Sequence, residues 1–266
     1  MRKLSIILIL AIAVYGCSQG KYSATNKAYK KQAKAFAKVI SKYPLKDSAA
    51  NTDYVGTTNF TMRKPNFVII HHTAQNSCEQ TLQTFTLTRT QVSAHYVVCR
   101  DGMVHHMLSD YLRAHQAGVS KWGNATDINS LSIGIEIDNN GFEPFSEAQI
   151  NSLIDLLGRL KRAYNIPAAN FIGHADIAPG RKVDPSRYFP WERLARAGYG
   201  LWYDTTAVNV PEHFDPYQAL RIIGYDIKKP EAALQSFKIH FVSADSSKVI
   251  TDGEKKILYD LSRKYQ

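Results

Sequence analysis

The middle of the chain alternates short apolar runs with longer segments whose apolar residues recur every three or four positions. A short run of apolar, β-branched residues is typical of a buried strand, and such runs occur at residues 66–70, 94–99, 130–137 and 171–174. The segment 147–164 instead has helical spacing and follows Ser146, a favourable N-cap residue. Strands that alternate with helices predict a layered α/β domain, which we place at residues 60–203.

The residues after this domain have a different pattern. Three short segments with helical spacing follow one another, at residues 216–223, 231–241 and 251–265. They predict a small C-terminal three-helix domain within residues 204–266.

The residues before the domain are Lys- and Ala-rich. Apolar residues recur there at helical spacing, namely Ala33, Phe36, Ile40 and Tyr43. We expect an amphipathic helix or a spacer over residues 21–45, followed by a polar linker that reaches residue 59.

The extreme N-terminus has the pattern of an export signal. A basic start is followed by an apolar run over residues 4–14, which is too short to span a bilayer. Small residues then lead into Cys17, so the segment resembles a bacterial lipoprotein signal. The resemblance implies cleavage after residue 16, acylation of Cys17 and, with Ser18 next, a lipid anchor in the outer membrane facing the periplasm. The alternative is a plain signal peptide with a chance cysteine.

Export also affects how the net charge and the two remaining cysteines are interpreted. The chain has 33 Lys and Arg against 23 Asp and Glu, a formal net charge of +10. Such a charge attracts nucleic acid, anionic lipid or acidic cell wall, and export leaves nucleic acid as the least suitable partner. An oxidising compartment permits a Cys78–Cys99 disulfide, but the sequence leaves open whether these two cysteines are bridged or free.

Two histidines and an aspartate are candidates for a metal site. His71 and His174 each end an apolar strand, at the sheet edge where α/β proteins place their sites. Asp184 lies before a proline in a loop that also contains glycine. Two histidines and one carboxylate suit zinc and leave a fourth position for water, which is the pattern of a zinc hydrolase.

Several separated motifs resemble one family, the N-acetylmuramoyl-L-alanine amidases of type 2. They are residues 68–74, 93–96, 100–102, 132–137, 173–179, 182–185 and 189–191. The resemblance implies a central mixed sheet flanked by helices and one zinc ion per chain, held by His71, His174 and Asp184. It selects His71 over His72 as the ligand, and it implies that Glu136 is the base and Lys182 a further catalytic residue.

These catalytic roles are also reasonable on physical grounds. Glu136 shares a strand face with the small residues Ser132 and Gly134, so we expect open space beside its carboxylate. A carboxylate there can move protons between water and a departing amine. Lys182 offers positive charge to a developing oxyanion.

One position departs from the pattern of the family. Gln116 stands where relatives often have a histidine that faces the substrate, so details of recognition are in doubt. We therefore take Gln116 and His72 as candidate substrate-binding residues. The remaining histidines are expected to be structural or at the surface.

These features predict a zinc amidase that cuts the bond between N-acetylmuramic acid and L-alanine in peptidoglycan. The expected partners are peptidoglycan or muropeptides, and the expected state is a monomer. Two alternatives remain open, a non-catalytic peptidoglycan-binding lipoprotein and a zinc hydrolase of another amide. The C-terminal helices resemble a peptidoglycan-binding module; the alternative is a helical extension that only braces the catalytic domain.

Overall fold

The computed structural model describes residues 20–41, 57–245 and 247–266. It divides into two compact units, residues 1–60 and 61–266, which are considered separately. The first unit contains the helix α1 (Ser23–Ile40), which confirms the helical spacing, and none of the residues of α1 is buried. Cys17 and Tyr43 lie outside the described residues. No helix in the described part of the chain is both long and apolar enough to cross a membrane.

The second unit is built on a five-stranded sheet. Its strands are β1 (Phe67–His72), β2 (Tyr96–Val98), β3 (Val104–His106), β4 (Ser132–Ile137) and β5 (Phe171–Gly173). They lie in the order β3-β2-β4-β1-β5. Only the β2–β3 pair is antiparallel, so the predicted mixed sheet is confirmed. Short β3, which follows the turn at Gly102, has no counterpart among the predicted strands.

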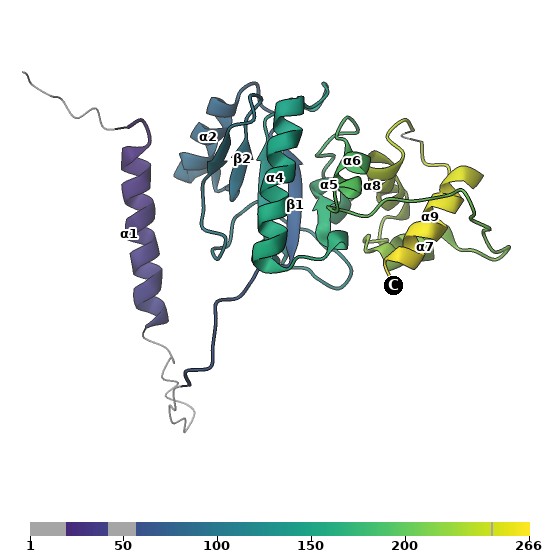
Figure 1. Ribbon diagram of the computed structural model, residues 1–266, viewed down its shortest axis with the longest axis horizontal. Helices are drawn as coiled ribbons and strands as arrows, with labels where there is room; N and C mark the ends of the chain where they lie inside the picture. The colour runs from purple at the N-terminus through teal and green to yellow at the C-terminus, as the bar shows by residue number, and fades with distance from the viewer. Residues whose placement is uncertain (1–19, 42–56, 246) are drawn as a thin grey trace, which may run out of the picture. The chain divides into compact units, whose positions relative to one another are not determined.

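Some helices lie between the strands in the sequence, and others follow the last strand (Figure 1). They are α2 (Cys78–Thr86), α3 (Ile128–Leu131), α4 (Glu147–Tyr164), α5 (His174–Ile177), α6 (Trp191–Arg196), α7 (Pro216–Ile223), α8 (Pro230–Phe241) and α9 (Asp252–Lys264). Single 3₁₀ turns occur at Thr88–Thr90 and Ala168–Asn170. The bounds of α4 agree with its sequence pattern because Ser146 and Gln149 form a reciprocal capping box at its start.

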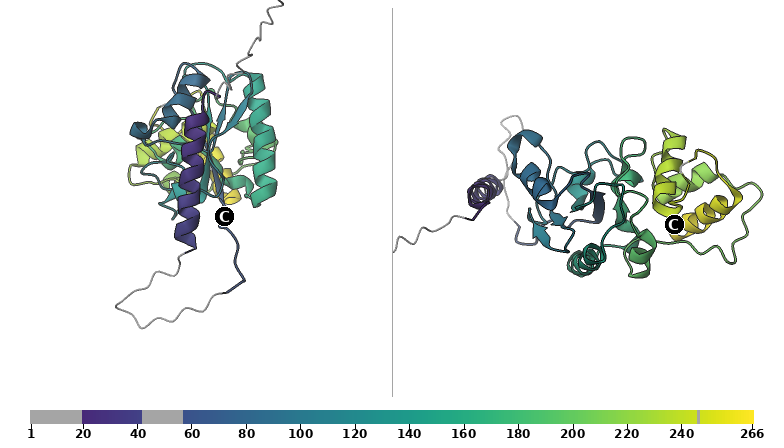
Figure 2. Two further views of the ribbon diagram at one scale, coloured as in Figure 1. Left: turned by 90° about the vertical axis from the view of Figure 1, so that its left-hand side faces the viewer. Right: turned by 90° about the horizontal axis from the view of Figure 1, so that it is seen from above.

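The two faces of the sheet are covered by different helices. One face packs its isoleucines and valines against the apolar stripe of α4 and against Trp191 and Leu194 of α6. The other face contributes Ile69 and Ile172 to a second cluster, which includes Phe237 and many other residues of α7, α8 and α9. The C-terminal helices therefore share a hydrophobic core with the sheet. Figure 2 shows them gathered at the opposite end of the unit from α2.

A short helical turn follows β5 and has no counterpart among the predicted elements. Residues 174–177 form this single turn, α5. The backbone N–H of Gly173 donates to the carboxylate of Asp176 at 2.7 Å. This bond satisfies a donor that would otherwise be unpaired at the start of the turn, and so it stabilises a helical conformation that periodicity does not reveal.

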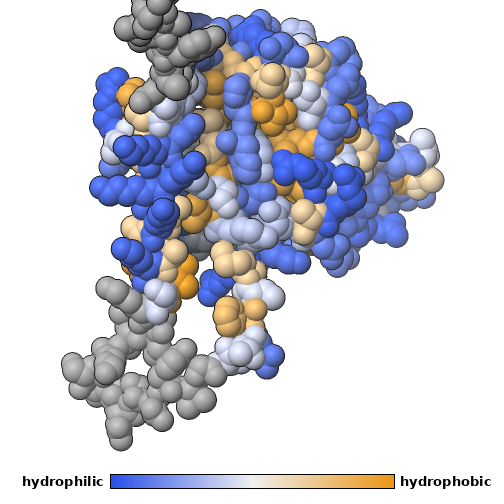
Figure 3. Space-filling view, turned by 60° about the vertical axis from the view of Figure 1, so that its left-hand side comes forward, coloured by the Kyte–Doolittle hydropathy of each residue, from blue (hydrophilic) through white to orange (hydrophobic). Residues whose placement is uncertain are grey.

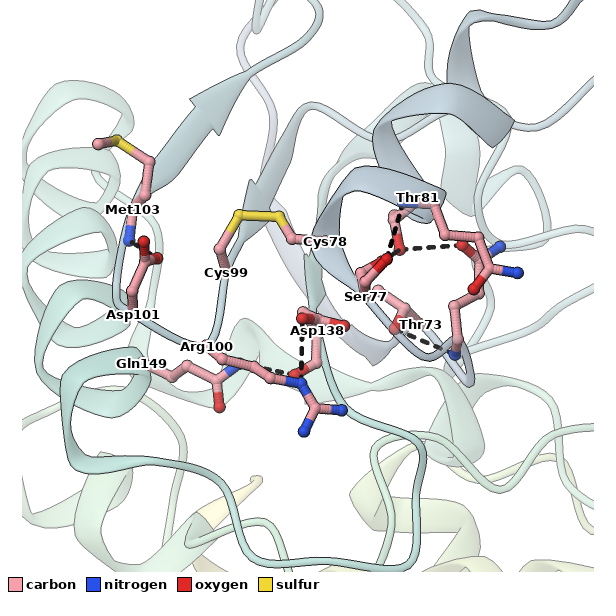
Figure 4. Close-up of a disulfide and its surroundings, with 12 residues drawn as sticks. Thr73, Ser77, Cys78, Thr81, Cys99, Arg100, Asp101, Met103, Asp138 and Gln149 are labelled. Atoms are coloured by element: carbon pink, nitrogen blue, oxygen red, sulfur yellow. Dashed lines mark hydrogen bonds and ion pairs between the residues drawn. A yellow bond between two sulfur atoms is a disulfide. The ribbon is translucent and has the colours of Figure 1, made fainter.

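A disulfide joins Cys78 to Cys99 in the structure, with Cα atoms 5.2 Å apart (Figure 4). Cys78 is the first residue of α2, and Cys99 follows β2 directly. The bridge therefore ties the start of α2 to the sheet. Nearby, Arg100 pairs with the buried carboxylate of Asp138 at 3.2 Å.

The molecular surface on the face drawn in Figure 3 is mainly hydrophilic, with small apolar patches.

Candidate metal centre

The candidate ligands and the candidate base come from adjacent strands and the loop beyond them. Parallel pairing of β1 with β4 sets His71 opposite Glu136. Parallel pairing of β1 with β5 sets Ile70 opposite Gly173, so His174 begins α5 one residue further on. Asp184 reaches the same place from a loop, and its backbone carbonyl accepts the N–H of Ala175 at 2.7 Å.

Three donor atoms converge at the end of these strands. Nδ1 of His71 lies 2.9 Å from Nδ1 of His174, and each of these atoms lies 3.0 Å from Oδ2 of Asp184. All three side chains are buried. Among the described residues, this trio is a group whose atoms are close enough together to hold one metal ion. The three residues predicted to bind the metal thus form a compact set of nitrogen and oxygen donors.

The far nitrogen of each imidazole is occupied by an acceptor. Nε2 of His71 donates to the side-chain oxygen of Gln116 at 2.6 Å, and Nε2 of His174 donates to the backbone carbonyl of Ala117 at 3.1 Å. A protonated Nε2 leaves the lone pair on Nδ1, which then points toward the other two donors. The consecutive residues Gln116 and Ala117 therefore orient the two histidine rings. The resulting set of two nitrogen donors and one carboxylate fits a zinc ion.

The orientation of the Gln116 amide is fixed by a further residue. The hydroxyl of Ser132 donates its only proton to the carbonyl of Ile128 at 2.6 Å. Ser132 must then accept from the amide nitrogen of Gln116, 2.8 Å away. The amide oxygen consequently faces His71. The structure places the polar end of Gln116 against the candidate metal ligand His71, and its side chain also lines the cavity. Its expected role in substrate binding stays a prediction.

Gly134, two positions before Glu136, makes room for the side chain of Gln116. A Cβ atom on Gly134 would lie 2.6 Å from Cγ of Gln116, far inside a normal carbon–carbon contact. The open space expected on this strand face lies beside Glu136, which lines the cavity. Next to Gly134 the space is filled, because the distant loop that contains Gln116 folds over this part of the strand.

Electrostatic interactions within the trio are strong. Burial opposes the protonation of His71, but the charges of Glu136 and Asp184 outweigh it and raise its pKa. Burial and the neighbouring His71 lower the pKa of His174 to about 4. Burial alone would raise the pKa of Asp184, but its close contacts with the two histidine rings lower it well below its usual range. These interactions favour an ionised Asp184 beside a neutral His174.

Glu136 lies beside this centre without a fixed partner. Burial raises the pKa of its carboxyl group. Its Oε2 atom is inaccessible and has no hydrogen-bond partner among the described residues. A buried, unpaired carboxylate oxygen is costly in a protein interior. Its presence here is typical of a site that acts on water or a ligand.

The centre opens into a cavity of about 370 Å³. Glu136, Lys182 and His72 line the cavity together with the trio. The facing wall includes residues of α2 and the loops around it, namely Thr73, Gln75, Thr81, Thr84, Phe85 and Ser93. A cavity of this size can hold a small peptide or sugar fragment next to the candidate metal donors.

Of the other histidines, His95 has a structural role. It is fully buried, its Nδ1 accepts the N–H of Gly134 at 3.0 Å, and its Nε2 lies 2.9 Å from the carbonyl of Leu112. His72 is different, because it lines the cavity while its Nδ1 accepts the N–H of Ser186 at 3.1 Å. Its expected role in substrate binding stays a prediction.

Two features of the centre were given no role by sequence reasoning. Arg181 lines the cavity, and its guanidinium donates at 2.6 Å to the same Ala117 carbonyl that holds His174. Asp176 accepts three hydrogen bonds, from Gly173 at the end of β5, from Tyr225 in the loop after α7 and from His240 in α8. The sequence does contain one indication of a role for Asp176, because it is a charged residue two positions after the candidate ligand His174.

The sheet topology, the cavity and the donor trio define an α/β domain with a candidate metal site at the edge of its sheet. Residues 61–187 match the family described as N-acetylmuramoyl-L-alanine amidase. The chain is 35% identical over 206 residues to the N-acetylmuramoyl-L-alanine amidase AmiD of Escherichia coli strain K12, covering 65% of this chain and 74% of AmiD. The chain therefore belongs to the N-acetylmuramoyl-L-alanine amidase family, which is in general zinc-dependent.

Solved structures support the same assignment. The complex of the E. coli AmiD amidase with the substrate anhydro-N-acetylmuramic acid-L-Ala-D-gamma-Glu-L-Lys has a TM-score of 0.69 and 28% identity, covering 83% of this chain and 97% of that one. AmpDh3 from Pseudomonas aeruginosa, in complex with an anhydromuramic pentapeptide, also has a TM-score of 0.69 and 28% identity, covering 81% and 98%. The predicted fold, family and enzyme class are confirmed.

Proposed function

We propose that this chain is a zinc amidase that hydrolyses the amide between the lactyl group of N-acetylmuramic acid and L-alanine. The observation that supports this most directly is the position of Glu136, opposite His71 on the neighbouring strand and next to three converging metal donors. Peptidoglycan fragments are the proposed substrates. They are also what the two relatives of known structure hold in their complexes.

The metal would be one zinc ion held by His71, His174 and Asp184. Zinc in such a site supplies a Lewis acid and lowers the pKa of a coordinated water toward neutrality. The histidines meet the requirement for neutral ligands because acceptors hold both Nε2 atoms and leave Nδ1 free.

The chain's own residues would carry out the proton transfers. Glu136 accepts a proton from the attacking water and delivers it to the nitrogen of L-alanine as the C–N bond breaks. Its raised pKa suits both steps, because a carboxyl group that titrates closer to neutrality can take up and release protons. Lys182, on the cavity wall, supplies positive charge near the oxygen on which negative charge develops. The products are a lactyl carboxylate and a free peptide that begins at L-alanine.

The experiment that tests this function compares the wild type with a Glu136→Gln variant. We expect stoichiometric zinc in both proteins and release of peptides beginning at L-alanine only from the wild type, with activity of the variant reduced by at least about 100-fold. Mass spectrometry of digested sacculi and of a soluble anhydromuropeptide would measure this. Binding without cleavage by the wild type would favour a recognition protein, and cleavage elsewhere would indicate another amide.

We also propose that the protein is a monomeric lipoprotein of the outer membrane that faces the periplasm. The sequence pattern up to Cys17 supports the anchor. The form of α1 is compatible with a helix near an anionic surface, because at 3.6 residues per turn its lysines fall within an arc of about 100°. These residues are Lys27, Lys30, Lys31, Lys34 and Lys38, opposite Tyr29, Phe36 and Ile40. Labelled fatty acid should be incorporated into the wild type and not into a Cys17→Ala variant.

A further inference from the structure

A buried polar cluster joins the C-terminal helices to the turn that contains His174. The carboxylate of Asp176 accepts three hydrogen bonds, each 2.7 Å long: from the hydroxyl of Tyr225, from Nδ1 of His240 and from the backbone N–H of Gly173. Asp176, Tyr225 and His240 are 1%, 3% and 5% exposed. Every bond to this carboxylate is thus made in the interior, where an unpaired oxygen would be costly.

The same carboxylate controls the geometry around the candidate ligands. His174 lies between Gly173 and Asp176, so the bond from Gly173 closes a short loop around it. Within that loop the N–H of Ala175 donates to the carbonyl of Asp184 at 2.7 Å. A displacement of Asp176 would therefore move the backbone that relates His174 to Asp184.

The two side-chain donors, one in the loop between α7 and α8 and one in α8, are themselves packed against aromatic rings. The ring of His240 stacks on Trp191, with ring centroids 3.9 Å apart, and on Phe241, with centroids 4.0 Å apart. The ring of Tyr225 packs edge-on against Trp122 at 5.0 Å. Burial and the charge of Asp176 raise the pKa of Tyr225 well above its usual value, so its hydroxyl remains a proton donor. A shift of α5 that carried either donor along would disturb these ring contacts.

We propose that Tyr225 and His240 are positioning residues of the metal site, which hold His174 in place through Asp176. The C-terminal helices are then a support for the ligand sphere, in addition to any contact they make with the cell wall. This inference rests on the proposed zinc site. It follows from three short buried bonds onto a residue two positions from a ligand, and from the core that α7 and α8 share with β1 and β5.

The test removes each donor while keeping an aromatic ring at its position, using Tyr225→Phe and His240→Phe. Each change leaves a buried carboxylate oxygen short of a partner, and α5 can relieve this only by moving. Residues that orient ligands through hydrogen bonds typically change metal affinity 10- to 100-fold. We expect zinc affinity, measured by competition with a chelating dye, to fall by about 10- to 100-fold in each of the two variants.

A matched control lies in the same helix as His240. Lys238 is fully buried, and its ammonium group binds Asp245, in the loop after α8, and the buried Glu254 of α9. Lys238→Met should lower the melting temperature, because it leaves the buried carboxylate of Glu254 without its cation. Its zinc affinity should stay within about two-fold of the wild type. Equal losses in all three variants would mean that loosening the helices weakens the site in general, and would overturn the proposal.

A second readout works without metal. Amide hydrogen exchange at residues 174–177 of the metal-free protein should be faster in Tyr225→Phe and His240→Phe, and unchanged in Lys238→Met. Wild-type zinc affinity together with unchanged exchange in both ring variants would overturn the positioning role alone. Failure of the wild type to bind zinc would instead overturn the proposed function and this inference together. Tyr225→Phe, which removes one oxygen atom, keeps the test valid if His240→Phe does not fold.

Discussion

Gly134→Ala is the substitution whose effect on the metal centre can be worked out most fully. A Cβ atom at this position would meet Cγ, Cδ and Cβ of Gln116 at 2.6, 3.0 and 3.2 Å. Normal carbon contacts begin near 3.5 Å, so the two side chains must separate by about 1 Å. Because the contacts involve the base of the Gln116 side chain, moving its end alone does not relieve them.

The strand cannot give way in place of Gln116. The N–H of Gly134 donates to Nδ1 of His95 at 3.0 Å, and the carbonyl of Gly134 accepts the N–H of His95 at the same distance. Gln116 must therefore move, and its 2.6 Å bond to Nε2 of His71 lengthens to about 3.6 Å, beyond hydrogen-bonding range. We expect a loss of about 1–3 kcal/mol in the free energy of unfolding and a 10- to 100-fold loss in zinc affinity.

The assay is a double-mutant cycle on zinc affinity with Gly134→Ala and Gln116→Ala. In the Gln116→Ala background the clashing Cγ and Cδ atoms are gone, so adding Gly134→Ala should change zinc affinity by less than about two-fold. Thermal unfolding of the metal-free proteins would measure the packing cost separately. If the two effects simply add, or if Gly134→Ala binds zinc as the wild type does, Gln116 does not transmit the perturbation to His71.

Three further predictions concern the metal, the disulfide and pH. Removal of zinc by a chelator should abolish activity and lower the free energy of unfolding by about 2.7 kcal/mol relative to protein with free zinc at 100 times its dissociation constant; an unchanged melting temperature would argue against a native-state metal. Replacing Cys78 and Cys99 together by serine should cost about 3 kcal/mol, since the bridge closes a loop with a sequence separation of 21 residues, and unfolded, unreduced wild type should have no free thiol from this pair. Burial lowers the pKa of His95 from 6.5, so the unfolded state binds its proton more readily and the stability that His95 contributes is lost as pH falls below about 6.5. Urea unfolding of the metal-free protein between about pH 5 and pH 8 should therefore show a flatter pH dependence in His95→Gln than in the wild type.

The sequence predicted best what depends on local pattern. The limits of α4 follow from its apolar stripe and its Ser146 cap, both of which lie within the segment itself. The proximity of His71 and His174 followed from strand ends, because parallel strands bring their carboxyl ends to one edge of a sheet. Family motifs were needed to choose His71 over His72, since the two histidines are adjacent in the strand.

What the sequence did not predict depends on contacts between distant segments. Gln116 approaches Gly134 and His71 from a loop whose course has no periodic signal. The bonds of Asp176 with Tyr225 and His240 join residues separated by 49 and 64 positions. A residue type alone does not reveal such partners, because the same aspartate would read equally well as a solvated turn residue.

The separation of the three donors along the chain has a consequence for how the protein matures. His71 lies 103 positions from His174 and 113 from Asp184, so the site exists only after the parallel pairing of β1 with β5 has closed a long loop. Non-local pairing of this kind is a slow step in folding, whereas helices such as α4 form locally and early. Zinc uptake during refolding should accordingly lag behind the far-ultraviolet helical signal. The time course of zinc uptake would then report when the sheet is complete.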